Sequence, residues 1–246
     1  MREENKQSHA SKLSSGRQST QISGPARDFV AGSLWGRSLL PGEVERVASE
    51  ITVRSFDAGG YVCRKGEPVG HWIGVIDGLI KMSSASPTGK TITFTGIPPG
   101  GWFGEGSLLK DRTWRYDAIA IRASSVALLP RAAFMRLLES SIPFNRFLLE
   151  QLNERLSHFI GLVEFDRLLE PDARVARCVA SLFNPRLYPR IATSLAISQE
   201  EIGYLCGLSR QRVNQSLQVL EAAGLLNVEY GRITVRDLEG LRQFDR

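Results

Sequence analysis

Residues Ser198–Gly224 read SQEEIGYLCGLSRQRVNQSLQVLEAAG, a pattern that predicts two short helices joined by a tight turn. Ser198 followed three residues later by Glu201 is a capping-box start. Gly207 tolerates the left-handed backbone that a tight turn requires. Ser209 is then placed to cap the second helix.

The second helix, expected over Ser209–Ala223, has two unlike faces. Val213, Leu217 and Leu220 recur at the spacing of one helical face and predict its buried side. The opposite face carries guanidinium and amide groups in place of the usual mixture of Lys and Glu: Arg210, Gln211, Asn214, Gln215 and Gln218. Because such planar groups pair with guanine and adenine edges in a major groove, this face predicts base recognition. A plain helical hairpin with a polar outside is the alternative.

The residues after Gly224 predict a hairpin of two short strands. Leu225 and Leu226 begin an extended run, Glu229–Arg232 turn the chain back, and Ile233–Val235 form the returning strand. Two strands directly after a helix pair indicate a winged helix-turn-helix. The run EIGYLCGLSRQRVNQSLQVLEAAGLL, with the later GRITVRDLEGL, resembles the DNA-binding domain of the CRP/FNR family of bacterial transcription regulators.

The resemblance assigns DNA contacts to the second helix. They are Ser209, Arg210, Gln211, Arg212, Asn214 and Gln215. Arg210 matches the family's recognition arginine, whereas Gln211 stands where a Glu is usual and Gln215 where an Arg is usual. We therefore expect a two-fold symmetric site that keeps a guanine in each half and differs from the common half-site beside it. Arg212 is either a phosphate contact, a solvated side chain, or the partner of Glu221 or another acid.

Composition and charge are compatible with a regulator of two domains. The chain has 246 residues, 42% of them hydrophobic, and a formal net charge of +5. No apolar stretch is long enough to cross a bilayer and the first residues lack a signal core, so we expect a cytoplasmic protein without a membrane partner. The basic signal is weak in residues 171–246, which hold ten Arg, no Lys and eight acidic residues.

The cysteines and histidines are scattered and indicate neither a metal site nor a catalytic triad. Cys63, Cys178 and Cys206 are far apart, which predicts reduced thiols and no zinc site or disulfide framework. They also lack the spacing of iron–sulfur sensors, and no haem site is indicated. The effector and any cofactor therefore stay unknown at this point, and the chain is not expected to be an enzyme.

The region before the long helix divides into an arm and a β domain. Residues 1–26 are rich in Ser, Gln and Lys and predict a disordered arm. A sensor domain is expected over 27–140, beginning with short helices. From Thr52 to Leu129, alternating runs such as YVCRKG and KTITFTGI are separated by Gly-rich turns, which predicts a barrel or jelly roll. The order of its glycines resembles the cyclic-nucleotide-binding β-roll of the same family.

The same resemblance places a ligand site at Gly104, Glu105 and Arg115. In cyclic-nucleotide receptors of the family, a Gly-Glu start and an Arg about ten residues later hold the ligand, with the carboxylate near a ribose hydroxyl and the guanidinium at the phosphate. A structural ion pair between Glu105 and Arg115 is the alternative to a ligand site.

Four residues depart from the cyclic-nucleotide pattern. Tyr116 replaces the small hydroxyl residue after the arginine, and Asp117 replaces a small apolar residue. Phe159 and Ile160 stand where hydroxyl residues would contact the adenine. Binding of cyclic AMP should be weakened by the bulk of Tyr116, by the negative charge of Asp117 near an anionic ligand, and by the hydrogen-bond partners missing at Phe159 and Ile160. We therefore expect no response to cyclic AMP.

A single apolar stripe runs along a helix expected over 141–170. Its members, at spacings of four, four, four, three and four, are Phe144, Leu148, Leu152, Leu156, Phe159 and Val163. Packing on its own β domain alone is one explanation. The resemblance implies instead a dimerisation helix, with contacts at Leu148, Leu152, Leu156, Phe159 and Val163. Glu170-Pro171-Asp172 should interrupt this helix, and the winged helix-turn-helix then occupies 171–246.

The predicted fold is α+β: an N-terminal double-stranded β-helix (jelly-roll) sensor domain, a long dimerisation helix and a C-terminal winged helix-turn-helix. The predicted function is sequence-specific transcription regulation by a homodimer whose partners are double-stranded DNA and RNA polymerase. The alternatives are a cyclic-nucleotide-responsive regulator and a ligand-binding signalling module whose C-terminal domain binds protein. A jelly-roll enzyme is disfavoured, because cupin-type sites need several inward His and carboxylate ligands and the β segment contains only His71.

Overall fold

The computed structural model describes residues 23–86, 91–110, 113–168, 170–191 and 193–245, with the backbone alone for 163–168. The predicted disordered arm therefore falls mostly outside the described residues. Its last four residues are not an arm, because helix α1, Ser23–Ala31, already begins there. Ala26, Phe29 and Val30 are buried, and this burial explains the earlier start. No helix within these ranges is long and apolar enough to cross a membrane.

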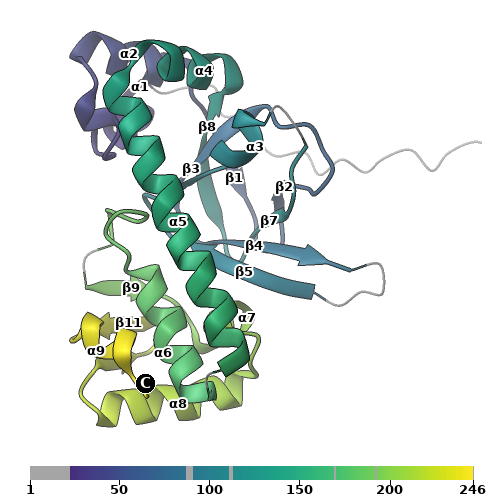
Figure 1. Cartoon of the computed structure of the whole chain (residues 1–246), viewed down its shortest axis with the longest axis vertical. Coiled ribbons are helices and arrows are strands. Elements are labelled where there is room, and N and C mark those ends of the chain that lie inside the picture. The colour runs from purple at the N-terminus through teal and green to yellow at the C-terminus, as the bar shows by residue number, and fades with distance from the viewer. Residues whose placement is uncertain (1–22, 87–90, 111–112, 169, 192, 246) are drawn as a thin grey trace, which may run out of the picture.

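The sensor domain is a double-stranded β-helix of two antiparallel sheets, which confirms the predicted fold class (Figure 1). Its strands are β1 (Thr52–Phe56), β2 (Tyr61–Cys63), β3 (His71–Asp77), β4 (Ile80–Ala85), β5 (Thr91–Ile97), β6 (Trp102–Phe103), β7 (Asp117–Ala120) and β8 (Ser124–Pro130). One sheet has the order β1-β8-β3-β6 and the other β2-β7-β4-β5. Apolar side chains from both sheets, such as Val75 and Ala120, fill the space between them.

Short helices cover the outer face of the first sheet. Besides α1 they are η1 (Gly36–Ser38), α2 (Pro41–Glu50) and α4 (Arg131–Ser140), while α3 (Glu105–Leu109) follows β6. Trp72 and Trp102 of the sheet meet Trp35 and Phe144 in one aromatic cluster, with ring centroids 4.5 Å apart for Trp72 and Trp102. This cluster fixes the start of the long helix against the sensor.

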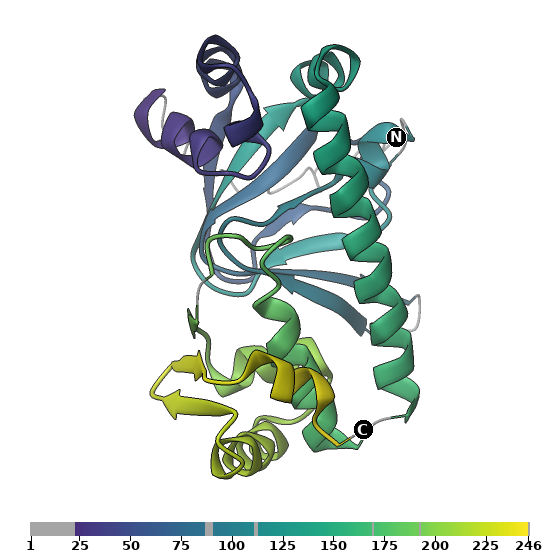
Figure 2. The same cartoon turned by 60° about the vertical axis from the view of Figure 1, so that its left-hand side comes forward.

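Helix α5, Ile142–Leu168, runs along the whole molecule from the sensor to the C-terminal domain (Figures 1 and 2). The predicted interruption is confirmed, because α6, Pro171–Leu182, begins with Pro171 at its first position and turns back beside α5. The described C-terminal elements are then β9 (Ser194–Ala196), α7 (Gln199–Cys206), α8 (Arg210–Ala222), β10 (Leu226–Glu229), β11 (Arg232–Val235) and α9 (Leu238–Gln243). The helix pair and hairpin match the sequence prediction, and β9 adds a third strand beside β11.

Candidate nucleic-acid interface and ligand cavity

The helix-turn-helix is fixed by local hydrogen bonds that the sequence pattern predicts. The Ser198 hydroxyl accepts from the Glu201 backbone N–H at 3.2 Å, and the Glu201 carboxylate accepts from the Ser198 backbone N–H at 2.6 Å. Gly207 ends α7 with φ at 66°, in the left-handed region that favours glycine. The Ser209 hydroxyl then accepts from the Arg212 backbone N–H at 3.2 Å and begins α8.

Helix α8 presents the predicted polar face to solvent. Val213, Leu217 and Leu220 are buried in the core of the C-terminal domain. The exposed side chains on the opposite side are Arg210, Gln211, Gln215 and Gln218. Within the described part of the chain, Arg210 makes neither a side-chain hydrogen bond nor an ion pair. Its guanidinium is therefore available to an external acceptor.

Besides the Ser209 cap, three of the predicted DNA contacts make hydrogen bonds inside the protein: Arg212, Asn214 and Gln215, whose side-chain oxygen accepts from Arg212 Nη1 at 3.4 Å. The Arg212 guanidinium lies 2.6 Å from Asp172 Oδ1 in α6, and the Ser216 hydroxyl donates to the same oxygen at 2.7 Å. Of the three alternatives for Arg212, the structure places it against an acid, which is Asp172 and not Glu221. The Asn214 side-chain oxygen accepts from the Gln199 side-chain amide at 2.8 Å, which joins α8 to the start of α7.

The wing lies beside the beginning of both helices. A hollow of about 340 Å³ separates Arg210 and the first residues of α7 from the hairpin tip at Glu229–Gly231. Tyr230 is completely exposed at that tip. Arg232 begins the returning strand and binds Ser194, and Arg236 directly after that strand binds Asn227. The exposed polar face of α8 and the wing thus share one side of the domain.

A cavity of about 990 Å³ lies between the sensor sheet, α3 and α5. The three residues predicted as a ligand site, Gly104, Glu105 and Arg115, all line it. The other lining residues are Met82, Phe94, Phe103, Gly106, Ser107, Lys110, Thr113, Tyr116, Leu152, Arg155, Leu156 and Phe159. The cavity therefore combines a mainly apolar wall with several cations.

Glu105 does not form the ion pair that the sequence suggested as an alternative. Its carboxylate accepts from Arg155 Nε at 2.7 Å and from the Trp72 indole N–H at 3.2 Å, and Arg115 is exposed. Arg155 also donates to the Trp102 backbone oxygen. Burial alone would lower the pKa of Arg155, but the Glu105 carboxylate together with the nearby Tyr188 and Tyr116 outweighs burial, and the pKa is raised. Arg155, fifty residues from its partner in the sequence, was missed because no local pattern marks it.

The four departures from the cyclic-nucleotide pattern lie in different places. Tyr116 and Phe159 line the cavity, as expected. Asp117 is outside its lining, because the Asp117 carboxylate accepts from the Lys65 backbone N–H at 2.8 Å. The expected repulsion by Asp117 is therefore wrong. Ile160 is also outside the lining and is 61% exposed.

The apolar stripe of α5 divides between two faces. Leu148 is 2% exposed and packs in the aromatic cluster of its own sensor domain, so its prediction as a dimer contact is wrong. Leu152, Leu156 and Phe159 all line the cavity, but Leu152 and Phe159 are half-buried whereas Leu156 is 59% exposed. The side chain of Val163 lies outside the described residues. Three further exposed apolar residues on α5, which the stripe missed, are Ile142, Leu149 and Ile160.

Comparison with known proteins covers both halves of the chain. Residues 53–141 match the family model of the cyclic nucleotide-binding domain, and residues 173–244 match that of the Crp-like helix-turn-helix domain. The chain is 24% identical to the CRP-like cAMP-activated global transcriptional regulator of Mycobacterium tuberculosis, over 82% of this chain and 91% of that relative. It is 28% identical to the transcriptional regulator SdrP of Thermus thermophilus, over 77% of this chain and 92% of SdrP.

A solved structure has the same fold. FixK2 from Bradyrhizobium japonicum superposes with a TM-score of 0.65 at 22% identity, covering 80% of this chain and 98% of FixK2.

Proposed function

Because the chain belongs to the CRP/FNR family of transcription regulators, which are not enzymes, we propose that it is a homodimer that reads a two-fold symmetric operator through α8. The exposed face of α8 carries this proposal. Arg210 lies in the first turn, is exposed and has no partner within the described residues, so it can reach guanine O6 and N7 together. Contact with RNA polymerase in the cytoplasm belongs to the same proposal and rests on the family alone.

The operator should differ from the family's common half-site at the base next to the retained guanine. Gln211 and Gln215 are exposed beside Arg210, in place of the acid and the arginine usual there. An amide pairs best with adenine, whereas a carboxylate favours cytosine. We therefore infer a half-site that keeps one guanine and gains adenine beside it.

Dimerisation through α5 is supported by its uncovered apolar side chains. Leu149 is 68% exposed and Leu156 59% exposed, seven residues apart and hence on one side of the helix. A helix-turn-helix gains affinity when two reading helices are held about one DNA turn apart. A second copy of α5 is the occupant that meets both needs.

Control by cyclic AMP is disfavoured by the cavity. Tyr116 puts a bulky ring where the receptors have a small hydroxyl residue, Phe159 offers no hydroxyl group, and both oxygens of Glu105 already accept hydrogen bonds. The exposed cations Lys110 and Arg115 together with the apolar wall favour an anionic ligand with an apolar body.

Selection from a random-sequence DNA pool, followed by titration of the selected duplex, tests the proposal. Arg210→Ala should weaken binding by about 1–3 kcal/mol and relax selection of the guanine. Arg37→Ala removes the same charge from an exposed residue of η1 and serves as the matched control. Unchanged affinity and selectivity of Arg210→Ala would refute the assignment. Failure of the unaltered chain to select any DNA would favour a C-terminal domain that binds protein.

A further inference from the structure

The C-terminal domain is docked on the sensor of the same chain. Helix α7 packs closely against β5. The approach is so close at Gly96 that a Cβ atom added to this glycine would lie only 2.9 Å from Leu205 Cδ1. The Lys81 ammonium of β4 lies 5.2 Å from the centre of the Tyr204 ring. Gly96 and Lys81 lie at the end of the β4–β5 hairpin away from its turn, and Figure 1 shows the C-terminal domain below this hairpin.

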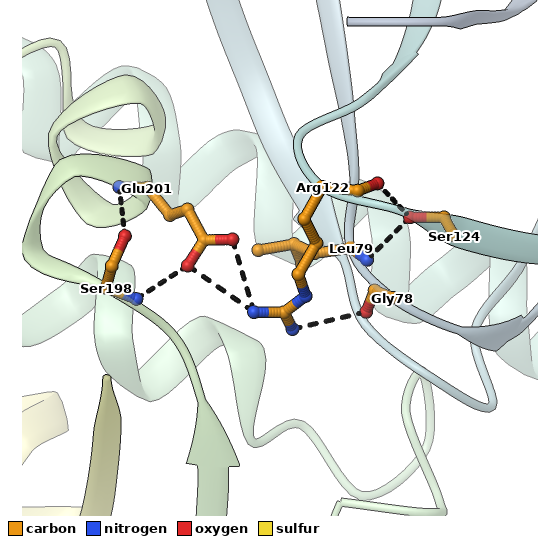
Figure 3. A network of polar contacts seen from close by, with 6 residues as sticks. All are labelled: Gly78, Leu79, Arg122, Ser124, Ser198 and Glu201. Carbon is orange, nitrogen blue, oxygen red and sulfur yellow. Dashed lines mark hydrogen bonds and ion pairs between the residues drawn. The ribbon is translucent and has the colours of Figure 1, made fainter. Parts of the chain in front are cut away.

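An ion pair in which one guanidinium nitrogen bonds both oxygens of a carboxylate joins the two domains at this contact (Figure 3). Arg122, in the turn between β7 and β8, donates through Nη1 to both oxygens of Glu201 at 3.2 and 3.4 Å. Its Nη2 reaches the Gly78 backbone oxygen at 3.4 Å. Glu201 is only 11% exposed at its side chain and Arg122 31%, so the pair is shielded from much of the screening that weakens surface ion pairs.

Both members of the pair are held in place by their own domains. The Ser124 hydroxyl donates to the Arg122 backbone oxygen at 2.7 Å and accepts from the Leu79 backbone N–H at 3.2 Å (Figure 3). On the other side, the Glu201 carboxylate also accepts from the Ser198 backbone N–H. The carboxylate that caps α7 is thus the one that Arg122 holds, so the ion pair ties the position of α7 to the sensor.

A second attachment lies in the loop after α6. Leu187 and Tyr188 are buried in the core of the sensor, and the Tyr188 hydroxyl donates to the Gly96 backbone oxygen at 3.0 Å. The Asn184 side chain donates to Glu154 of α5 at 2.7 Å. The C-terminal domain therefore meets the sensor through two elements, α7 and the loop after α6, both next to Gly96 of β5.

Docking leaves the reading face of α8 open. Arg210, Gln211 and Gln215 stay exposed, and the docking contacts come from α7 and the loop before β9. The contact therefore does not hide the DNA-binding surface. It fixes where α8 lies relative to α5, the helix proposed to pair with a second copy.

We propose that Arg122 is a positioning residue for operator recognition: by holding α7 on the sensor it sets the separation of the two α8 helices in the dimer. This inference rests on the proposed function. Once one half-site is bound, the second binds at an effective concentration that is highest when the reading helices already match the spacing. A loosened domain should lose that advantage while each α8 still reads its own half-site.

Arg122→Gln, which removes the charge and keeps a polar side chain, tests the inference with three duplexes. These are the selected operator, one half-site alone, and operators lengthened at the centre by about one or two base pairs. Binding to the full operator should weaken about tenfold, because the second half-site binds at a lower effective concentration. Binding to the single half-site should stay within about twofold, and the loss of affinity on lengthening should become smaller. Arg122→Lys should restore part of the difference, since an ammonium keeps the charge without the fork.

Arg37→Gln provides the control for loss of one positive charge. Hydrogen exchange of peptides spanning 91–97 and 199–206 should quicken in Arg122→Gln, which reports the loosened contact without DNA. Equal weakening on half-site and full operator, or an unchanged response to lengthening, would overturn the role of Arg122. Tighter binding to the full operator would overturn it too, because docking would then oppose recognition. If the unaltered chain selects no DNA at all, the proposed function fails and the inference with it.

Discussion

Replacing Leu149 and Leu156 by Glu should separate the dimer while leaving the folded protomer intact. Both side chains project from α5 and are 68% and 59% exposed, so the protomer gains little from them. Glutamate is also a good helix former, which keeps the propensity of α5 close to its original value. Any large effect of the double variant must then come from a surface that a second copy covers.

The exposed fractions give the expected size of the effect. Fully burying a leucine side chain contributes about 1.5–3 kcal/mol. Because roughly two-thirds of each side chain is still uncovered, covering it in a dimer should contribute about 1–2 kcal/mol. Two-fold symmetry places four such leucines in the interface, so their loss should weaken dimerisation by about 4–8 kcal/mol. That corresponds to at least about a thousandfold in the dissociation constant.

Sedimentation velocity over a concentration series measures this change, with circular dichroism to check that α5 stays helical. Leu40→Glu is the matched control, because Leu40 is 71% exposed and lies outside α5. The double variant should also bind a full operator no better than a half-site. A double variant that sediments as a dimer at the same concentrations as the unaltered chain would refute the assignment of this face.

Three further predictions concern single side chains and the cavity. Arg212→Ala should leave the salt dependence of operator binding unchanged because Asp172 holds the guanidinium, and a slope shallower by about one unit would reveal a phosphate contact instead. Calorimetric titration with cyclic AMP should show no tight binding; a micromolar dissociation constant together with enhanced operator binding would contradict the reading of Tyr116 and Phe159. Burial and the nearby Arg155 charge lower the pKa of His158 to about 4. The pKa of a histidine in the unfolded chain is about 6.5, so below that pH the unfolded chain binds more protons than the folded chain, and the folded state loses stability as the pH falls. Urea unfolding measures this change. As the pH falls from about 6.5 to 5, the free energy of unfolding of His158→Gln should decrease by about 2 kcal/mol less than that of the unaltered chain. An equal decrease in both would show that another group causes the pH dependence.

The helix-turn-helix could be predicted because its determinants are local. The Ser198–Glu201 cap, the left-handed Gly207 and the Ser209 cap each act within about one turn of the chain. Spacing alone therefore located both helices and the polar face of α8. It could not show that Arg212 meets Asp172, because that acid lies in α6, forty positions earlier.

The long helix shows where periodicity fails. Leu148 and Leu149 are neighbours in sequence but lie on different faces of α5, one packed on the sensor and one exposed. A regular apolar stripe shows that one side of a helix is apolar. It does not show whether the chain's own sensor domain or a second copy covers that side. Since α5 leaves its own sensor partway along its length, the residues covered by the sensor and those left open do not follow one repeat.

Helix α5 is also the element on which the cavity, the proposed dimer face and the docked domain meet. Leu156 lines the cavity and is exposed on α5, Arg155 closes the cavity against Glu105, and Glu154 holds the loop that carries Tyr188. A ligand moves α8 only if it binds one arrangement of these contacts better than another. Because the cavity touches α5 and not α8, such a preference must reach the DNA-binding domain through α5, its loop contacts or β5. The Arg122–Glu201 pair lies at the far end of that route, where it joins α7 to the turn between β7 and β8, so a movement of α7 away from the sensor would break this ion pair.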